Sequence, residues 1–529
     1  MLEGYVRQDI TAGRGLMLID PHGELVDGIE EWCALRGLDR IRSIHVLRPG
    51  SDRLIPGFNP LGGEAGRDVT TRVDYMVAAC AQAWGAKNLG ETPRLEKILR
   101  ALFYVIAHHG LTLAEAPALL LPHDPKGLRR ALTDGLPNES MQLVWEQLNA
   151  LPRREFAEYV ESTATRLTKF LASPAMRLIV GQKTRAIDFR AAMDESQVVL
   201  VDLSAARSFS HENARTLGGL LVSDLFYSSL GRDLAIARQK PFTLYIDEAY
   251  DYLSGSVERL LDQSRKFGLH AVLSHQRIGQ LRAQGESVYN AVMGCTQTKI
   301  VLGGLSDDDA EIMAREIMRS DINLAVPKPG LTMPVVVGEE RVRLRSGNVS
   351  NARSRGASRT SSFGTTGGVT TTLGASEDEF GENIRAVASS ALSGGWSDSV
   401  GEAESHGESS SETSGWSETF RSIREERPVQ LYTLEESFHL AMRRIRDLPD
   451  RTALVKRRGR PVDEIRTLDI ARQLSVPGIT RRARERAEHR AVYQSSVAAA
   501  EAEIDVRRTA LLPARPSESF WQAEDDRDA

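Results

Sequence analysis

Runs of apolar residues that end in polar residues predict the strands of this chain. Residues 16–19 (Leu-Met-Leu-Ile) run directly into Asp20, and residues 198–201 (Val-Val-Leu-Val) run into Asp202. Similar apolar runs lie at 44–47, 242–246, 271–274 and 299–302, and stretches with helical spacing separate them. Continuous apolar runs are typical of strands that a parallel sheet buries on both faces. The pattern therefore predicts an α/β fold with a doubly wound sheet.

Other segments of the chain depart from this alternation of strands and helices. Between 63 and 180 the apolar residues recur at helical spacing, which predicts an inserted all-helical subdomain. Ser, Gly and Thr dominate 346–427, which predicts a flexible or weakly structured low-complexity segment. We therefore divide the chain into 1–62 (start of the α/β core), 63–180 (helical insertion), 181–345 (remainder of the core), 346–427 (Ser/Gly/Thr-rich segment), 428–480 (C-terminal ordered segment) and 481–529 (charged helical tail).

Composition and charge exclude several classes of protein. The 67 basic and 72 acidic residues leave a net charge of −5, so a nucleic-acid partner has to be bound by a local basic patch. Three cysteines lie far apart without CxxC spacing, which argues against a disulfide framework and against a zinc cluster. No apolar run approaches the ~20 residues that span a bilayer, so the sequence predicts no transmembrane segment in this chain.

Adjacent carboxylates follow the apolar run at 242–246. Asp247 and Glu248 in this position match the Walker B pattern of P-loop ATPases. The first carboxylate holds Mg²⁺ or its water shell, and the second orients or deprotonates the attacking water. The alternative is a strand end that acidic residues merely solvate.

Polar residues also follow other predicted strands and helices. Asp20 and Glu24 come after the run at 16–19, where a doubly wound sheet places its ligands. Arg265 lies near the end of a helix, where an arginine can reach the γ-phosphate bound by a neighbouring subunit; for Lys266 beside it, capping of the helix dipole is the alternative. Gln276 follows the run at 271–274 and is suited to sensing phosphate or water.

The order of these motifs resembles the conjugative coupling ATPases, the DNA-transfer proteins of type IV secretion in the FtsK–HerA superfamily. The resemblance rests on IDPHGELV, a helical insertion, VVLVDLS, LYIDEA, SRKFGL, SHQ and KIVLGGLSDDDAE, over roughly 1–320. A second stretch, QLYTLEESFHLAMRRIRDLPDRTALVK, resembles the family's C-terminal segment. The resemblance implies a RecA-like motor core that uses ATP with Mg²⁺, a homohexameric ring, and DNA as cargo. It also implies type IV secretion or relaxosome partners, and a location that is cytoplasmic or peripheral at the inner membrane.

The resemblance also implies roles for single residues. Asp247 would hold Mg²⁺ through water and Glu248 would be the catalytic base. Asp20 matches the family's acidic residue on the strand after the P-loop helix, and Glu24 lies with it near the nucleotide. Arg265 matches the arginine proposed to act across a subunit interface, and Gln276 matches a sensor-like glutamine.

One element of the family is absent from the sequence. No G-x-x-x-x-G-K-[ST] motif occurs in the 529 residues, and residues 1–15 resemble the segment that follows the P-loop in the family. We therefore expect the first strand and P-loop to be encoded upstream of Met1. The predicted function is the ATPase motor of a coupling protein that drives DNA toward a secretion channel. The alternatives are a catalytically incomplete ring or docking component, and a related ATPase that powers protein export.

Overall fold

The chain forms two compact units, and each is described by itself. The computed structural model describes residues 1–62, 69–84, 92–124, 127–204, 209–253, 261–322, 328, 332–353, 368–374, 387–393, 408–428, 431–470 and 476–511. The first unit comprises Met1–Asn323 with Thr433–Ala529, and the second comprises Leu324–Tyr432. None of the described helices is both long and apolar enough to cross a bilayer.

A five-stranded parallel sheet is the centre of the first unit. Its strands are β1 (Gly15–Asp20), β2 (Ile44–Leu47), β4 (Val198–Asp202), β5 (Phe242–Ile246) and β6 (Leu269–Leu273), in the order β2-β4-β1-β5-β6. Every residue of β1 is buried because β1 is the middle strand. At one edge, β6 has a single hydrogen-bonded neighbour among the described residues, and most of its residues are half-buried or exposed. The predicted α/β fold with a parallel sheet is confirmed.

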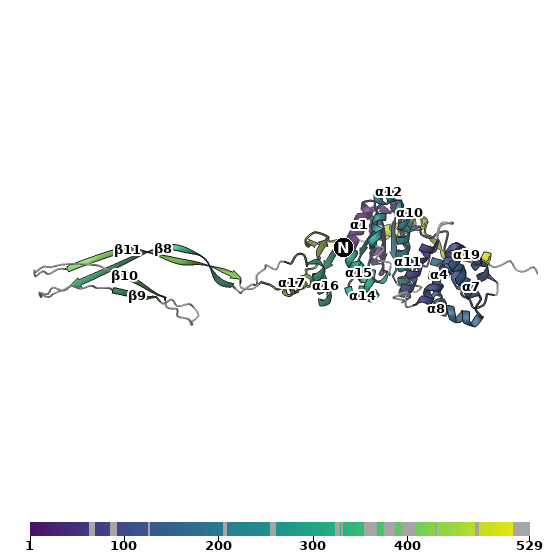
Figure 1. Ribbon diagram of the computed structural model, residues 1–529. Coiled ribbons are helices and arrows are strands. Elements are labelled where there is room, and N and C mark those ends of the chain that lie inside the picture. Colours follow the sequence, from purple (N-terminus) through teal and green to yellow (C-terminus); the bar gives the residue numbers. More distant parts are fainter. Residues whose placement is uncertain are drawn as a thin grey trace, which may run out of the picture. The chain divides into compact units, whose positions relative to one another are not determined.

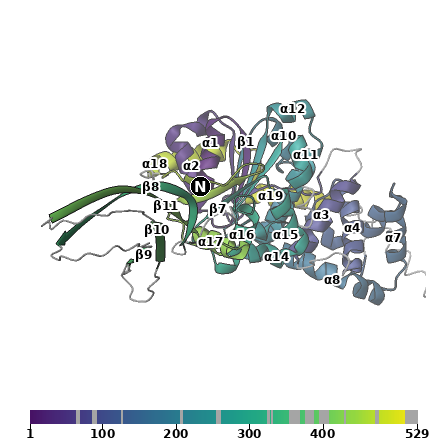
Figure 2. The ribbon, with the colours of Figure 1, turned by 60° about the vertical axis from the view of Figure 1, so that its left-hand side comes forward.

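Helices cover both faces of this sheet. Side chains of a strand alternate between its faces, so Leu16 and Leu18 of β1 enter one core while Met17 and Ile19 enter the other. Figure 2 shows α1 and α2 on one side of β1, and α10 and α11 on the other. These helices are α1 (Leu2–Thr11), α2 (Glu24–Arg36), α10 (Phe189–Asp194) and α11 (His211–Leu230). The remaining helices near the sheet are α12 (Leu234–Gln239), α14 (Ile278–Gln284) and α15 (Glu286–Cys295).

The described residues between 69 and 180 form helices and no strand. The helices are α3 (Thr70–Ala83), α4 (Pro93–His108), α5 (Ala116–Leu119), α6 (Leu128–Thr133), α7 (Glu139–Asn149), α8 (Arg153–Leu171) and α9 (Pro174–Val180). Helix α3 packs on α11, where Arg72 donates to the buried carboxylate of Asp224 at 2.7 Å. Burial raises the pKa of Asp224 to about 6. The helical insertion thus shares one hydrophobic core with the sheet.

A second, antiparallel sheet lies in the same unit. Strand β7 (Thr298–Leu302) pairs with β12 (Thr452–Arg457), which pairs with β13 (Asp463–Arg466). Helices α16 (Asp307–Ile317) and α17 (Leu434–Arg446) pack together beside it (Figure 1). The prediction that 299–302 belongs to the main sheet is wrong. The apolar run identifies the strand, but its hydrogen-bonding partner comes from a segment far along the chain.

The charged C-terminal segment packs on the core and is not a solvated tail over its described residues. It forms α18 (Pro477–His489), β14 (Gln494–Ser496) and α19 (Val497–Leu511), and β14 pairs with β3 (Leu54–Pro56). Arg484 forms ion pairs with Asp27 and Glu30 of α2, and Arg486 pairs with Asp39. A charge pattern predicts a polar helix face, but only the fold reveals that acidic residues of α2 face it.

The second unit is a set of paired strands. Strand β8 (Thr332–Arg353) pairs antiparallel with β11 (Glu408–Pro428), and β9 (Gly368–Gly374) pairs with β10 (Val387–Ser393) (Figure 1). The described parts of 346–427 therefore form strands, whereas the sequence predicts a flexible segment. Two-stranded pairing satisfies backbone hydrogen bonds without a large core, so a lack of apolar residues does not exclude it. Across the ladder, Arg341 and Arg343 both contact Glu418.

Candidate functional site at the carboxyl edge of the sheet

Polar residues line up where four neighbouring parallel strands end. The register pairs Asp20 at the end of β1 with Asp202 at the end of β4. Ile19 pairs with Ile246, so Asp247 directly after β5 lies at the level of Asp20. Carboxyl ends of parallel strands are where α/β sheets bind ligands. The parallel register is thus what brings together carboxylates that are far apart in the sequence.

The carboxylate of Asp20 caps helix α2. Its oxygens accept hydrogen bonds from the backbone N–H groups of His22 at 2.9 Å, Leu25 at 2.8 Å and Val26 at 3.0 Å. The residue is 1% exposed, so this cap is shielded from water. The turn also needs Gly23, whose φ is +82°, because a Cβ there would lie 2.8 Å from Oδ1 of Asp202. Asp20 therefore orders the turn that carries His22.

Replacing Asp20 should affect stability first. We expect Asp20→Ala to lower the free energy of unfolding by about 2 kcal/mol, because it leaves buried N–H groups at the start of α2 without an acceptor. Urea unfolding followed by circular dichroism measures this change. Glu24→Ala, at an exposed position four residues later, is the control and should leave the free energy of unfolding nearly unchanged. Equal stability of the two variants would contradict the capping role.

Glu248 is held at the centre of the site by two side chains. Its Oε1 accepts from Nε2 of Gln276 at 2.8 Å and lies 3.2 Å from Nε2 of His22. The side chain of Glu248 is 16% exposed, against 61% for His22. The backbone at Glu248 is left-handed (φ +47°), which costs a residue with a Cβ roughly 1 kcal/mol. Strained conformations of this kind cluster at functional sites, because the fold holds them for a purpose other than stability.

His22 is a site residue that the sequence analysis does not single out. The hydrogen bond to Glu248 is the largest of the effects that raise the pKa of His22 above 6.5, and the charges of Asp20 and Asp247 add to it. The sequence signal that could have identified His22 is its position in the turn directly after an apolar strand. Neighbouring His275 differs, because desolvation lowers its pKa and its buried Nδ1 has no partner among the described residues.

The ion pair between His22 and Glu248 should depend on pH. Because the folded pKa of His22 is raised, its contribution to stability is fully present below pH 6.5 and is lost as the pH rises through the folded value. We expect Glu248→Gln to lower the pKa of His22 measured by NMR titration of histidine Cε1–H signals, with His22→Asn providing the assignment. Gln276→Ala retains the carboxylate charge, so it should not lower this pKa. An unchanged pKa in Glu248→Gln would contradict the pairing.

Asp247 and Glu24 have free carboxylates as far as the described residues show. Asp247 is half-buried, its backbone N–H donates to Ile19, and no side-chain partner is found among the described residues. Mg²⁺ is commonly bound by one or two carboxylates together with water and phosphate oxygens. Asp247 fits that role through water, whereas no group of three or more metal-ligating side chains occurs among the described residues. Glu24 lies exposed in the first turn of α2.

Arg265 lies away from the carboxylates within one chain. It is exposed on a short 3-10 helix, Ser264–Phe267, that precedes β6, whereas Gln276 follows β6. The five-residue strand between them spans about 16 Å. This helix is anchored by Arg232, whose fully buried side chain donates to the carbonyl of Phe267 at 3.0 Å. Within one chain, Arg265 and Gln276 therefore lie toward opposite ends of β6.

A second ionic network adjoins the site. Nε of Arg48 lies 3.4 Å from Oδ2 of Asp202, and its Nη2 contacts Asp27 at 2.7 Å and Glu30 at 2.9 Å. Arg484 of α18 contacts the same two carboxylates of α2. The C-terminal helix is therefore joined through α2 and Arg48 to the carboxyl edge of the sheet. Arg48 directly follows β2, and Asp202 is the last residue of β4.

With this geometry established, the chain can be compared with known proteins. Residues 246–330 match the family model of the type IV secretion-system coupling protein DNA-binding domain. This stretch begins at the end of β5 and includes Asp247, Glu248, Arg265 and Gln276. The resemblance to coupling proteins is therefore confirmed over these residues. No curated protein sequence matches the chain.

Several solved structures are similar at low identity. The unbound monoclinic form of the bacterial conjugative coupling protein TrwBdeltaN70 is 13% identical, with 90% of this chain and 82% of that chain covered and a TM-score of 0.46. The plasmid coupling protein TrwB in complex with ADP and Mg²⁺ is 13% identical, with 90% and 84% covered and a TM-score of 0.47. VirB4 of Thermoanaerobacter pseudethanolicus is 13% identical, with 60% and 76% covered and a TM-score of 0.38. At these identities and TM-scores, the similar structures do not establish the function of this chain.

Proposed function

We propose that this chain is the motor core of a coupling-type ATPase that drives DNA toward a type IV secretion channel. The observation that carries the proposal is the position of Glu248. Its carboxylate is held by Gln276 and His22 next to Asp247, at the carboxyl edge of a parallel sheet. All but His22 belong to the stretch that matches the coupling-protein DNA-binding domain. A base adjacent to a metal-binding carboxylate at a strand end is the arrangement that phosphoryl transfer to water requires.

The residues take different parts in this proposal. Glu248 accepts the proton of the attacking water, and Gln276 and His22 hold its carboxylate in place. Asp247 would bind Mg²⁺ through water, which supplies the positive charge that phosphate oxygens need. Asp20 orders the turn at the edge of the site, and Glu24 lies beside it. We further propose that the motor is a homohexameric, RecA-like ring in the cytoplasm or at the inner membrane, in which Arg265 acts from the adjacent subunit.

The chain by itself does not fit a tightly bound triphosphate. Phosphate binding in ATPases of this type depends on backbone N–H groups of a Gly-rich loop and on one lysine. No such motif occurs in the 529 residues, and the groups that meet at the carboxyl edge are mainly carboxylates. In this proposal Glu248 and Asp247 act on water and Mg²⁺, and a P-loop that holds phosphate is not among the 529 residues. The second candidate is a docking or ring component that does not hydrolyse ATP.

Restoring the missing motif tests these candidates. We would fuse a strand and a G-x-x-x-x-G-K-[ST] loop ahead of Met1, and we call this protein the P-loop fusion. The coupling-motor proposal predicts that the P-loop fusion hydrolyses ATP and that added DNA raises its rate. Failure of the folded fusion to bind ATP would favour the docking component. Hydrolysis that DNA does not stimulate would favour an ATPase that powers protein export.

A further inference from the structure

The hairpin of β12 and β13 concentrates positive charge in an otherwise acidic chain. Between Thr452 and Arg466 there are five cationic side chains and two carboxylates, although the whole chain has a net charge of −5. Four of the cations occupy five consecutive positions at the tip: Lys456, Arg457, Arg458 and Arg460, with Gly459 between the last two. All residues from 457 to 460 are exposed. Basic clusters of this density are typical of surfaces that bind polyanions.

The tip is a well-defined turn. The N–H of Arg460 donates to the carbonyl of Arg457 at 3.0 Å, and Gly459 has a φ of +74°. A positive φ at the third residue of a four-residue turn favours glycine, because a Cβ there would be strained. The N–H of Arg458 donates to the carbonyl of Gln297 at 3.0 Å, which joins the tip to the residue before β7. The backbone therefore presents Arg458 and Arg460 from a fixed position.

Only some of these cations have partners within the chain. Nζ of Lys456 contacts Oγ of Ser320 at 2.6 Å and Oδ1 of Asp321 at 3.3 Å, and the N–H of Val462 also donates to Asp321. Arg457 forms an ion pair with Asp463. These contacts secure the base of the hairpin. The side chains of Arg458 and Arg460, by contrast, make no hydrogen bond or ion pair with the part of the chain that the structure describes.

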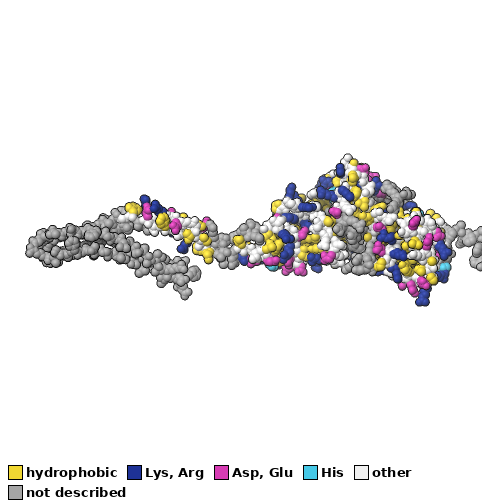
Figure 3. Space-filling view, in the orientation of Figure 1, with side chains coloured by type: hydrophobic (Ala, Val, Ile, Leu, Met, Phe, Trp, Pro, Cys, Tyr) yellow, Lys and Arg dark blue, Asp and Glu magenta, His cyan; other side chains and the backbone are white. Residues whose placement is uncertain are grey.

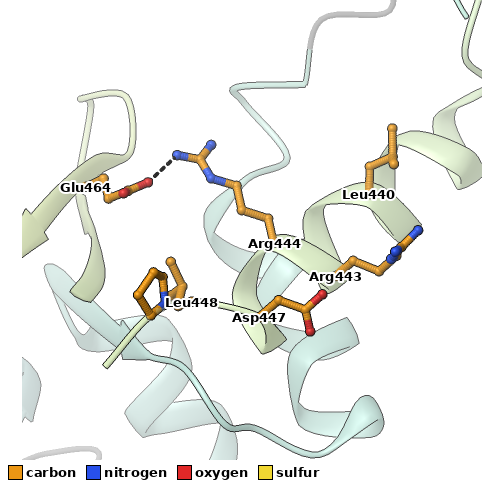
Figure 4. Close-up of a pocket in the computed structure, with 7 residues that line it drawn as sticks. Leu440, Arg443, Arg444, Asp447, Leu448 and Glu464 are labelled. Carbon is orange, nitrogen blue, oxygen red and sulfur yellow. Dashed lines mark hydrogen bonds and ion pairs between the residues drawn. The ribbon is translucent and has the colours of Figure 1, made fainter. Parts of the chain in front are cut away.

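The surroundings of the hairpin are also ordered by ion pairs. Arg444 of α17 donates to Glu464 of β13 at 2.8 Å, and both residues line a cavity of about 370 Å³ (Figure 4). The side chain of Arg444 therefore joins α17 to β13 and already has an acidic partner. In the view of Figure 3 cationic and acidic side chains are interspersed over the first unit. Arg458 and Arg460 differ from Lys456, Arg457 and Arg444 in having no acidic partner among the described residues.

We propose that Arg458 and Arg460 form a DNA-contacting site that binds the phosphate backbone. The site rests on the proposed function, since it assigns the DNA cargo to particular residues. Guanidinium groups present a planar fork of donors that matches phosphate oxygens. The hairpin lies beside β7, which falls within residues 246–330, the stretch that matches a DNA-binding domain. Phosphate contacts position DNA without reading its sequence, so binding should be independent of sequence.

The chemistry of the tip favours DNA over an anionic membrane. Elements that bind a membrane surface combine basic residues with large apolar side chains that enter the lipid. The tip from Arg457 to Val462 has only Pro461 and the half-buried Val462 as apolar residues. A nucleic-acid backbone is bound through electrostatic contacts to its phosphates, and this binding does not need the insertion of apolar side chains.

Fluorescence anisotropy of labelled DNA tests the site on the 529-residue chain. Single-stranded and double-stranded oligonucleotides of unrelated sequences are titrated at several salt concentrations. We expect Arg458→Ala/Arg460→Ala to weaken binding about tenfold and to make the slope of log K against log salt shallower by about 1.4–1.8, because two phosphate contacts are lost. Arg154→Ala/Arg166→Ala, which removes one exposed and one half-buried cation from α8, is the control with the same change in charge. The control should bind DNA like the parent chain.

The outcomes distinguish this site from the proposed function. Equal binding by the parent chain and the hairpin variant, or an equal loss in the α8 variant, overturns the site and leaves a DNA-binding motor standing. A parent chain that binds no DNA overturns both. Vesicles of phosphatidylcholine with phosphatidylglycerol provide the last comparison: a hairpin variant that loses vesicle binding but retains full DNA affinity would assign the site to a membrane surface and overturn the proposal.

Discussion

The 529-residue chain should bind Mg-ATP with a dissociation constant on the order of millimolar or weaker. No loop of backbone N–H groups and no P-loop lysine is present to offset the charge of the triphosphate. In the proposed site the triphosphate would meet the carboxylates of Asp247 and Glu24, and the charge of Glu248 has only His22 as a cationic partner among the described residues. Within the same chain, Arg265 precedes β6 and so lies toward the amino ends of the parallel strands. Binding close to unscreened carboxylates is unfavourable even when Mg²⁺ accompanies the nucleotide.

Calorimetric titration with Mg-ATP measures this affinity directly. The P-loop fusion is the matched control and should bind at least about a thousandfold more tightly, a difference of about 4 kcal/mol. DNA should not induce turnover in the unfused chain. Micromolar binding by the unfused chain would mean that the nucleotide site lies elsewhere in the molecule.

In the P-loop fusion, Glu248→Gln and Arg265→Ala should each abolish ATP hydrolysis while leaving ATP binding largely intact. Glu248 acts on the attacking water, and an arginine that stabilises the transferred phosphoryl group contributes about 10³–10⁵ in rate in other phosphoryl-transfer systems. Single-turnover rates and nucleotide affinities are measured in parallel. Lys266→Ala is the control, because Lys266 is also exposed and contacts the ring of Phe267 at 4.9 Å; it should retain most activity.

Mixing the two inactive variants tests whether Arg265 acts across a subunit interface. If Glu248 and Arg265 meet between subunits, some interfaces in a mixed ring receive both intact groups, and part of the activity returns. Within one chain Glu248 follows the carboxyl end of β5, whereas Arg265 precedes β6, so the proposal requires the two residues to meet between subunits. Mixed rings as inactive as either parent would mean that Arg265 has no part in the reaction.

Much of the α/β core could be predicted from local pattern. Apolar runs such as 16–19 and 198–201 become β1 and β4, because residues buried on both faces of a sheet must all be apolar. The positions of Asp20, Asp247 and Gln276 at or shortly after the carboxyl ends of strands also follow from the sequence. Parallel strands end at one edge, so these side chains were expected to lie near one another. The contact between Gln276 and Glu248 at 2.8 Å agrees with that expectation.

Pairing between distant segments was decided only by the tertiary structure. The run at 299–302 is a strand in either arrangement, yet its partner β12 makes it part of a separate sheet. Arg484 belongs to the segment predicted as a charged helical tail, and only the fold shows that Asp27 and Glu30 of α2 lie opposite it. His22 gains its role from one contact with Glu248, more than two hundred residues later. The physical reason is the same in each case. Local sequence determines the backbone conformation of a residue and the face of the helix or strand on which its side chain lies. Hydrogen bonds and ion pairs also depend on which remote segment packs against that face.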